Sequence, residues 1–158
     1  MDNLTNIATY VREAYLLVTG KDLTGQRLAD FLYLAQREQL AVTGRPLYRE
    51  PITAGLHGPV FPGIDGKDGD PNVIEEKTRY LLKNTILSYK DLSDGELEGV
   101  MVEQQSWQNA QKRPGKQYEL EDIRKDAGEI RPYDHFCDMY YDEDSENLPE
   151  ELREEPQP

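Results

Sequence analysis

The sequence predicts a mainly α-helical fold: a compact single domain with a small extended or β element after the second helix. Apolar residues recur at helical spacing along most of the chain, and capping residues, glycines and prolines divide them into separate helices. A stretch rich in Gly and Pro interrupts this pattern between residues 51 and 62. The chain has 158 residues, a length at which one domain buries about 70% of its unfolded surface, so we expect one domain.

The first helix is predicted from an amphipathic stripe near the N-terminus. The stripe consists of Leu4, Ile7, Ala8, Val11, Ala14, Tyr15 and Val18. Gly20 follows it, as expected for a residue just past a helix end.

The second helix is predicted to be the central one. Thr24 is a good N-cap residue, and Leu23 and Leu28 flank it as a hydrophobic staple. Gly44 is placed to end the helix near Thr43 in a left-handed conformation. Apolar residues fill two faces, which leaves little purely solvated surface: Leu28, Phe31, Leu32, Ala35 and Leu40 on one, Tyr33, Leu34 and Ala41 on the other.

The remaining elements follow from local signals. Residues 51–54 are predicted to be extended and residues 58–62 to form a rigid turn. Asp70 followed by Pro71 predicts the start of a third helix that continues toward Tyr89. Ser93 and Glu96 form a capping box that opens a helix up to Lys112, with Leu97, Val100, Met101 and Trp107 on its core side. Residues 118–128 are predicted to form a short strand and a helical turn.

Four short motifs in register resemble the Panacea domain, also known as the SocA-like or GepA-like domain. They are Leu-Thr-x-x-x-Leu from Leu23, Leu32-Tyr33-x-Ala35-Gln36, Gly44-x-Pro46-Leu47, and Ala54-x-x-x-Gly58-Pro59-Val60-x-Pro62. The agreement continues from Leu97 through Trp107 to Ala110, and covers residues 4–125. The resemblance implies an antitoxin that neutralises a toxin protein by binding it. At least one member resembles an adaptor that delivers its toxin to a protease, which implies a possible adaptor role, and others are phage or mobile-element proteins with no assigned partner.

The chain departs from the family pattern before the tryptophan. Many members carry a Thr-His pair, an acid and a proline there, where this chain has Met101 and Val102, Gln104 and Ser106. Any function of those polar residues elsewhere in the family is in doubt here.

The composition favours a binding protein of the cytoplasm, and the family resemblance implies a bacterial or phage-infected cell. The net charge of −13 argues against direct nucleic-acid binding, which needs clustered Lys and Arg, and permits a partner with a basic surface. The single cysteine, Cys137, fits a reducing compartment. The sequence shows neither a leader peptide nor a run of about 20 apolar residues that could span a bilayer, so no membrane association is expected.

The sequence signals for catalytic or metal-binding sites are weak, and we predict neither an enzyme nor a cofactor or metal site. Asp68, Asp70 and Asn72 occupy positions 1, 3 and 5 of an EF-hand-like loop, but the required Gly and the final acid are missing, so a flexible surface connection is favoured. His57 could be a general base, but no nucleophile context accompanies it, and a structural or interface role is favoured. His135 and Cys137 alone do not make a zinc site.

Tyr33 and Gln36 are candidate partner-binding residues together with His57. Both lie on the central helix, where they form part of a partner groove or, as the favoured alternative, pack against other helices. Trp107 is expected in the core.

The C-terminal segment 133–158 differs in composition from residues 1–132, the predicted helical domain. It has ten acids and one arginine, a net charge of −9, which leaves −4 of the total −13 for residues 1–132. An aromatic amphipathic stripe at 133–143 includes three further candidate partner-binding residues, Phe136, Tyr140 and Tyr141. The stripe either packs on the protein's own core or inserts into a groove of a basic partner. Beyond Asp144 we expect disorder in the free protein.

Three hypotheses for function follow. The first is an antitoxin that neutralises a cognate toxin by direct stoichiometric binding. The second is a phage or mobile-element inhibitor whose acidic segment mimics nucleic acid and occupies a basic cleft of a host protein. The third, an enzyme of unrecognised type, is the least favoured. The oligomeric state and the identity of the partner are left open by the sequence.

Overall fold

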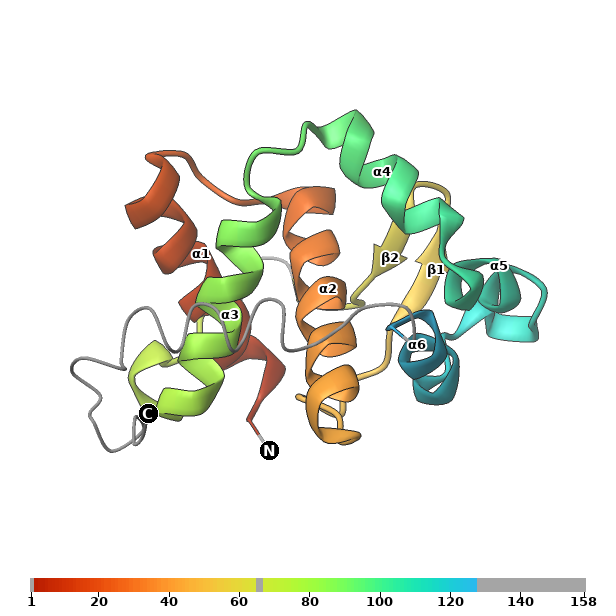
Figure 1. Ribbon diagram of the computed structural model, residues 1–158, viewed down its shortest axis with the longest axis horizontal. Coiled ribbons are helices and arrows are strands. Elements are labelled where there is room, and N and C mark those ends of the chain that lie inside the picture. Colours follow the sequence, from red (N-terminus) through yellow and green to blue (C-terminus); the bar gives the residue numbers. More distant parts are fainter. Residues whose placement is uncertain (1, 65–66, 128–158) are drawn as a thin grey trace, which may run out of the picture. The chain divides into compact units, whose positions relative to one another are not determined.

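The computed structural model describes residues 2–64 and 67–127, and over these ranges the protein is mainly helical (Figure 1). The helices are α1 (Leu4–Thr19), α2 (Gly25–Thr43), α3 (Glu76–Tyr89), α4 (Asp94–Glu103), α5 (Gln105–Gln111) and α6 (Leu120–Asp126), with short 3-10 turns η1 (Pro71–Val73) and η2 (Pro114–Lys116). Strands β1 (Thr53–Gly55) and β2 (Gly58–Val60) form the small sheet. The predicted fold class, with its β element after the second helix, is confirmed. The segment 133–158 lies outside the described residues.

Helix α2 lies at the centre, with α1 and α3 on one side and the hairpin, α4 and α6 on the other (Figure 1). Its middle is buried on every face, including the polar residues Asp30, Gln36, Arg37 and Glu38. Thr24 occupies the N-cap position, although its side chain makes no capping bond, and Gly44 ends the helix with φ +75°. The prediction of a central helix ending near Thr43 is therefore confirmed.

Helix α1 agrees with its predicted stripe. Every stripe residue is buried except Val18, which is 38% exposed. The side chain of Asn3 caps the helix by accepting from the backbone N–H of Thr5 at 2.7 Å, and Gly20 ends it in the left-handed conformation. Among the described residues, no helix combines the length and apolar character needed to cross a bilayer.

The prediction of a rigid turn at residues 58–62 is wrong for its first half. Residues 58–60 form strand β2, antiparallel to β1, with Ala54 opposite Pro59, and the turn lies at Leu56 and His57. Proline is tolerated here because the sheet has only two strands, so each strand is an edge. The Leu-His pair lacks the Asn-Gly type of signal that marks two-residue hairpin turns.

Two predicted helices have different bounds. Asp70 caps only the single turn η1, and α3 begins at Glu76. The helix opened by the capping box of Ser93 and Glu96 is broken at Gln104, where ψ is 135°. The chain restarts as α5 because the carboxylate of Asp126 accepts from the N–H groups at the start of that helix.

Candidate partner-binding surface

Tyr33 lies in the core, in a hydrogen-bonded cluster between α2, α5 and α6. Its hydroxyl is 2.9 Å from the Ser106 hydroxyl and donates to the Asp126 carboxylate at 3.2 Å. The same carboxylate accepts from the N–H groups of Gln105 and Ser106 at 3.1 and 2.9 Å. Burial raises the pKa of Tyr33 well above its usual range, so the hydroxyl stays protonated. The cluster joins three helices, which agrees with the packing role that the sequence analysis favoured for Tyr33.

Gln36 is equally buried and connects α2 to the segment that follows it. Its side-chain oxygen accepts from the N–H of Leu47 at 2.6 Å, and its amide donates to the carbonyl of Tyr48 at 3.1 Å. The hydroxyl of Tyr48 in turn donates to the carbonyl of Leu32. Because Gln36 is only 1% exposed, it offers no surface to a partner in this conformation.

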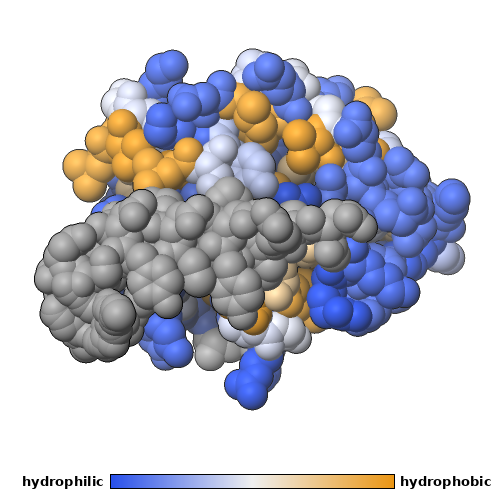
Figure 2. Space-filling view, viewed as in Figure 1, coloured by the Kyte–Doolittle hydropathy of each residue, from blue (hydrophilic) through white to orange (hydrophobic). Residues whose placement is uncertain are grey.

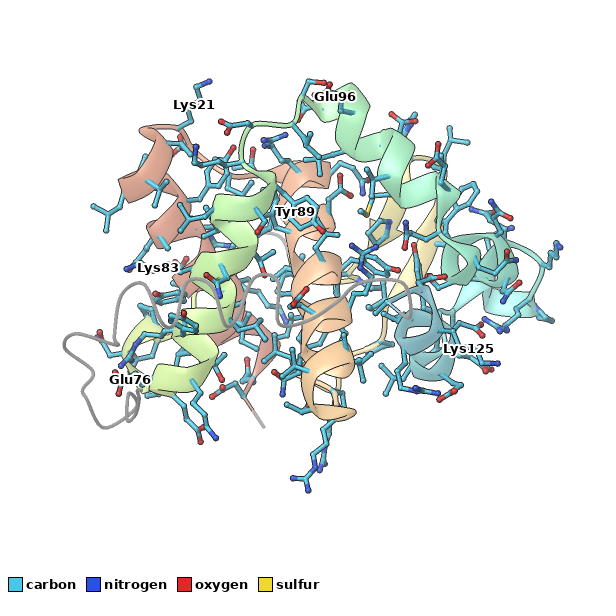
Figure 3. All side chains as sticks on the ribbon, viewed as in Figure 1. Lys21, Glu76, Lys83, Tyr89, Glu96 and Lys125 are labelled. Carbon is cyan, nitrogen blue, oxygen red and sulfur yellow. The ribbon has the colours of Figure 1, made fainter. Side chains whose placement is uncertain are left out.

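A second buried polar contact on α2 involves Arg37. Its guanidinium donates to the Gln104 side chain at 2.8 Å and to the hydroxyl of Tyr89 at 3.0 Å. Figure 3 shows Tyr89 at the end of α3, beside α2. These contacts join α2 to the break between α4 and α5 and to the last turn of α3, so this face of α2 is also structural.

His57, in contrast, is exposed at the tip of the hairpin. Its Nδ1 lies 2.9 Å from the Glu98 carboxylate of α4. The neighbouring Leu56, on the same turn, is 80% exposed. Of the three described candidate residues, the structure therefore places only His57 where a partner could reach it.

The hairpin is also anchored beside its turn by two further helices. The carbonyl of Gly55 accepts from the Trp107 indole N–H and from the Gln111 amide of α5, both at 3.0 Å. The amide of Gln26 on α2 donates to the carbonyl of Pro59 at 2.8 Å. Trp107 is half-buried, so the expectation that it lies in the core is corrected: the indole N–H supports the hairpin. The tip is thus a rigid, partly apolar projection.

Asp30 is a buried carboxyl beneath the hairpin that the sequence analysis did not single out. It is 2% exposed and accepts from the Gln26 amide at 2.9 Å. Burial raises its pKa to about 7, against the opposing effects of the Gln26 hydrogen bond and the positive charge of Arg27. The negative charges of Asp94 and Glu98 add to the upward shift.

We expect this carboxyl to make stability depend on pH. The folded protein holds the proton of Asp30 up to about pH 7, whereas the unfolded chain releases it near pH 4. The folded state therefore binds more protons than the unfolded chain between these two pH values. The free energy of unfolding consequently falls as pH rises through that window. The free energy of unfolding of Asp30→Asn, measured relative to that of the wild type, should therefore rise by about 3 kcal/mol from about pH 5 to about pH 8. Urea unfolding at both pH values measures this, and a constant difference would contradict it.

The loop at residues 67–70 is docked on α1, so the expectation of a flexible connection is corrected for this part. The N–H of Gly69 donates to the Thr9 hydroxyl and that of Asp70 to the Asn6 side chain, both at 2.8 Å. Asp68 pairs with Arg12 at 3.4 Å. The carboxylates considered as calcium ligands thus engage protein groups. No cluster of three or more His, Cys, Asp or Glu side chains suited to a metal occurs among the residues that the structure describes.

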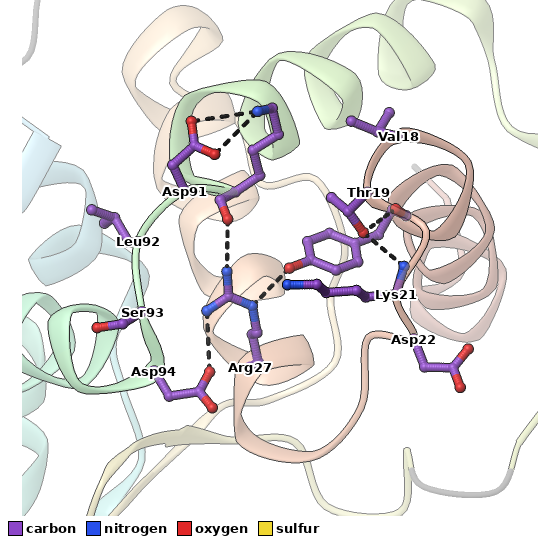
Figure 4. A pocket seen from close by; sticks show the side chains of 11 residues that line it. Val18, Thr19, Lys21, Asp22, Arg27, Asp91, Leu92, Ser93 and Asp94 are labelled. Atoms are coloured by element: carbon purple, nitrogen blue, oxygen red, sulfur yellow. Dashed lines mark hydrogen bonds and ion pairs between the residues drawn. The ribbon is translucent and has the colours of Figure 1, made fainter.

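A cleft lies between the end of α1, the start of α2 and the connection from α3 to α4 (Figure 4). Arg27 lies in it and donates to the Tyr15 hydroxyl at 2.9 Å, to Asp94 at 3.1 Å and to the carbonyl of Lys90 at 3.0 Å. The guanidinium also lies 5.7 and 5.5 Å from the ring centroids of Tyr15 and Phe31. Arg27 is therefore fixed in place and joins three segments of the fold.

The other candidate residues of the sequence analysis cannot be placed. Phe136, Tyr140 and Tyr141 lie outside the described residues, as do His135 and Cys137. Within the described part, sequence reasoning found His57 but missed Leu56 and the Glu98 partner, because the motif runs through Gly58 and Pro59 and gives no sign of where the tip projects.

In the comparisons with known proteins, no family model, no curated protein and no solved structure matches this chain.

Proposed function

We propose that this protein is an antitoxin-type protein of the cytoplasm that neutralises a cognate toxin by direct, stoichiometric protein–protein binding. The motifs that resemble the Panacea domain suggest the biological role. The observation that carries the binding role is the hairpin tip: a highly exposed leucine on a turn that three helices hold in place.

The tip has the properties of an anchor for a partner pocket. A rigid side chain loses little conformational freedom on binding, and a buried apolar anchor supplies a large share of the binding energy. Val60, on strand β2, adds a second exposed apolar side chain at 40%. The fixed conformation of the hairpin favours recognition of a folded protein over a flexible peptide.

Charge around the tip favours a basic partner. Helix α4, which contacts β2, carries four carboxylates, Asp94, Glu96, Glu98 and Glu103, and neither lysine nor arginine. An acidic helix beside the hairpin attracts cationic side chains and speeds the encounter with a positively charged surface. The toxin's binding face should therefore combine an apolar pocket with a lysine- or arginine-rich rim on the side that meets α4.

Growth rescue tests the proposal. The protein should restore growth when co-expressed with the protein of an adjoining gene that arrests growth when expressed alone. Leu56→Asp should abolish rescue, because a charge would enter the apolar pocket. Leu120→Asp is the matched control, since Leu120 is 44% exposed and lies on α6 rather than on the hairpin; it should rescue like the wild type. Equal rescue by both variants would place the interface elsewhere.

The acidic segment 133–158 supports a second candidate, an inhibitor that mimics nucleic acid in a basic cleft of a host protein. Its net charge of −9 is the observation that favours it. Deleting residues 133–158 distinguishes the two. An inhibitor of this kind would lose all activity, whereas an antitoxin that binds through the hairpin would keep its rescue.

A further inference from the structure

We propose that the C-terminal end of α1, together with the cleft beside it, is an interface between two copies of this chain. Three consecutive apolar residues in the last turns of this helix face solvent: Leu16 at 47%, Leu17 at 88% and Val18 at 38% exposure. Figure 2 shows the hydrophobic patch they form at the end of α1. Exposed apolar clusters of this kind mark interaction sites, and here a hollow adjoins the patch.

The cleft beside the patch can receive side chains from a partner. It has a volume of about 600 Å³, and Val18 belongs to both the patch and the cleft. Arg27 is held in place by Tyr15, Asp94 and the Lys90 carbonyl, so the cleft keeps its form without a partner (Figure 4). When two copies meet, the patch of each copy can enter the cleft of the other, so the contact is self-complementary.

The charges of the cleft favour a second copy as its occupant. Its lining carries three cations, Lys21, Arg27 and Lys90, and three anions, Asp22, Asp91 and Asp94, so its net charge is zero. A two-fold interface must complement itself, which equal numbers of opposite charges allow. A surface selected for a basic partner would be net negative, as α4 is.

Two adjacent residues are free to pair across such an interface. Within the described part of the chain, the side chains of Lys21 and Asp22 make no hydrogen bond or ion pair, unlike Lys90 with Asp91 and Arg27 with Asp94. Both are exposed, and Figure 3 shows the Lys21 side chain extending away from the molecule. In a two-fold contact, the lysine of each copy can face an aspartate of the other.

Sedimentation velocity of the full chain, from about 1 to about 500 μM, tests the proposal. Because the patch is small, we expect a dissociation constant in the micromolar range. Leu17→Asp should weaken association at least about tenfold, since a buried charge without a partner is costly. Leu120→Asp, at an exposed position on α6, is the control, and it should associate like the wild type. A wild type that stays monomeric across this range would overturn the proposal, as would equal association of wild type and Leu17→Asp.

Charge reversal provides a second test that does not depend on the apolar residues. Lys21→Glu changes the net charge of the cleft lining to about −2, and Asp22→Lys changes it to about +2, so each variant alone should repel its own copy and associate less than the wild type. An equimolar mixture of the two should recover association as a heterodimer. Failure of the mixture to associate more than either variant alone would contradict the two-fold arrangement. Circular dichroism of each variant serves to check that it is folded.

Discussion

Replacing Gln36 by leucine should destabilise the protein by about 2–5 kcal/mol, because two buried backbone groups lose their partners at once. The N–H of Leu47 and the carbonyl of Tyr48 both bond to the Gln36 side chain, and leucine can replace neither contact. Burial of these groups keeps water from substituting. Urea unfolding monitored by circular dichroism measures the change.

Gln39→Leu is the matched control for this substitution. Gln39 lies on the same helix at a half-exposed position, so the same chemical change there should alter stability by less than about 0.5 kcal/mol. If Gln36→Leu unfolds like the wild type but no longer rescues growth, Gln36 contacts the partner, and the packing role described above is wrong.

Gly58→Ala should also destabilise the fold by about 2–5 kcal/mol, through backbone strain and overpacking together. Gly58 has φ +137°, a conformation that residues with a side chain rarely adopt. An added Cβ would lie 3.1 Å from the Cβ of Met101, 3.2 Å from the Gln26 amide nitrogen and 3.3 Å from an oxygen of Asp30. The substitution therefore strains the turn and pushes the hairpin from α2 and α4.

Gly99→Ala provides a control that should stabilise the protein rather than destabilise it. Gly99 lies inside α4, and a Cβ there would meet no atom within 4 Å. Alanine is the better helix former, so this variant should gain about 0.5–1 kcal/mol. Thermal unfolding of the two variants side by side tests the account of the hairpin. A stable Gly58→Ala variant would show that the hairpin tolerates displacement and is less rigid than the contacts indicate.

Helix ends set by local chemistry could be predicted from the sequence. Gly20 and Gly44 end α1 and α2 as expected, and the capping box of Ser93 opens α4. The break at Gln104 could not be predicted, because the capping carboxylate comes from Asp126, 21 residues beyond Gln105. The hairpin was hidden for a related reason: its Leu-His turn is stabilised by Glu98 and by side chains of α2 and α5 rather than by its own residues.

The candidate site was predictable only in part, for similar reasons. Tyr33 and Gln36 lie on a helix with apolar residues on two faces, and only the packing of the other helices decides that both are buried. His57 was found through its motif. Leu56 has no signal of its own, because a leucine in sequence is far more often a core residue than an exposed one.

We propose that this protein binds a toxin partner one to one through the hairpin tip. The most direct measurement is calorimetric titration of the purified toxin with the full chain, alongside a toxicity assay at each ratio. We expect neutralisation to be complete at about equimolar ratio, with at least about a hundredfold loss of affinity for Leu56→Asp. Neutralisation at a small fraction of one equivalent would mean turnover. That result would contradict the account.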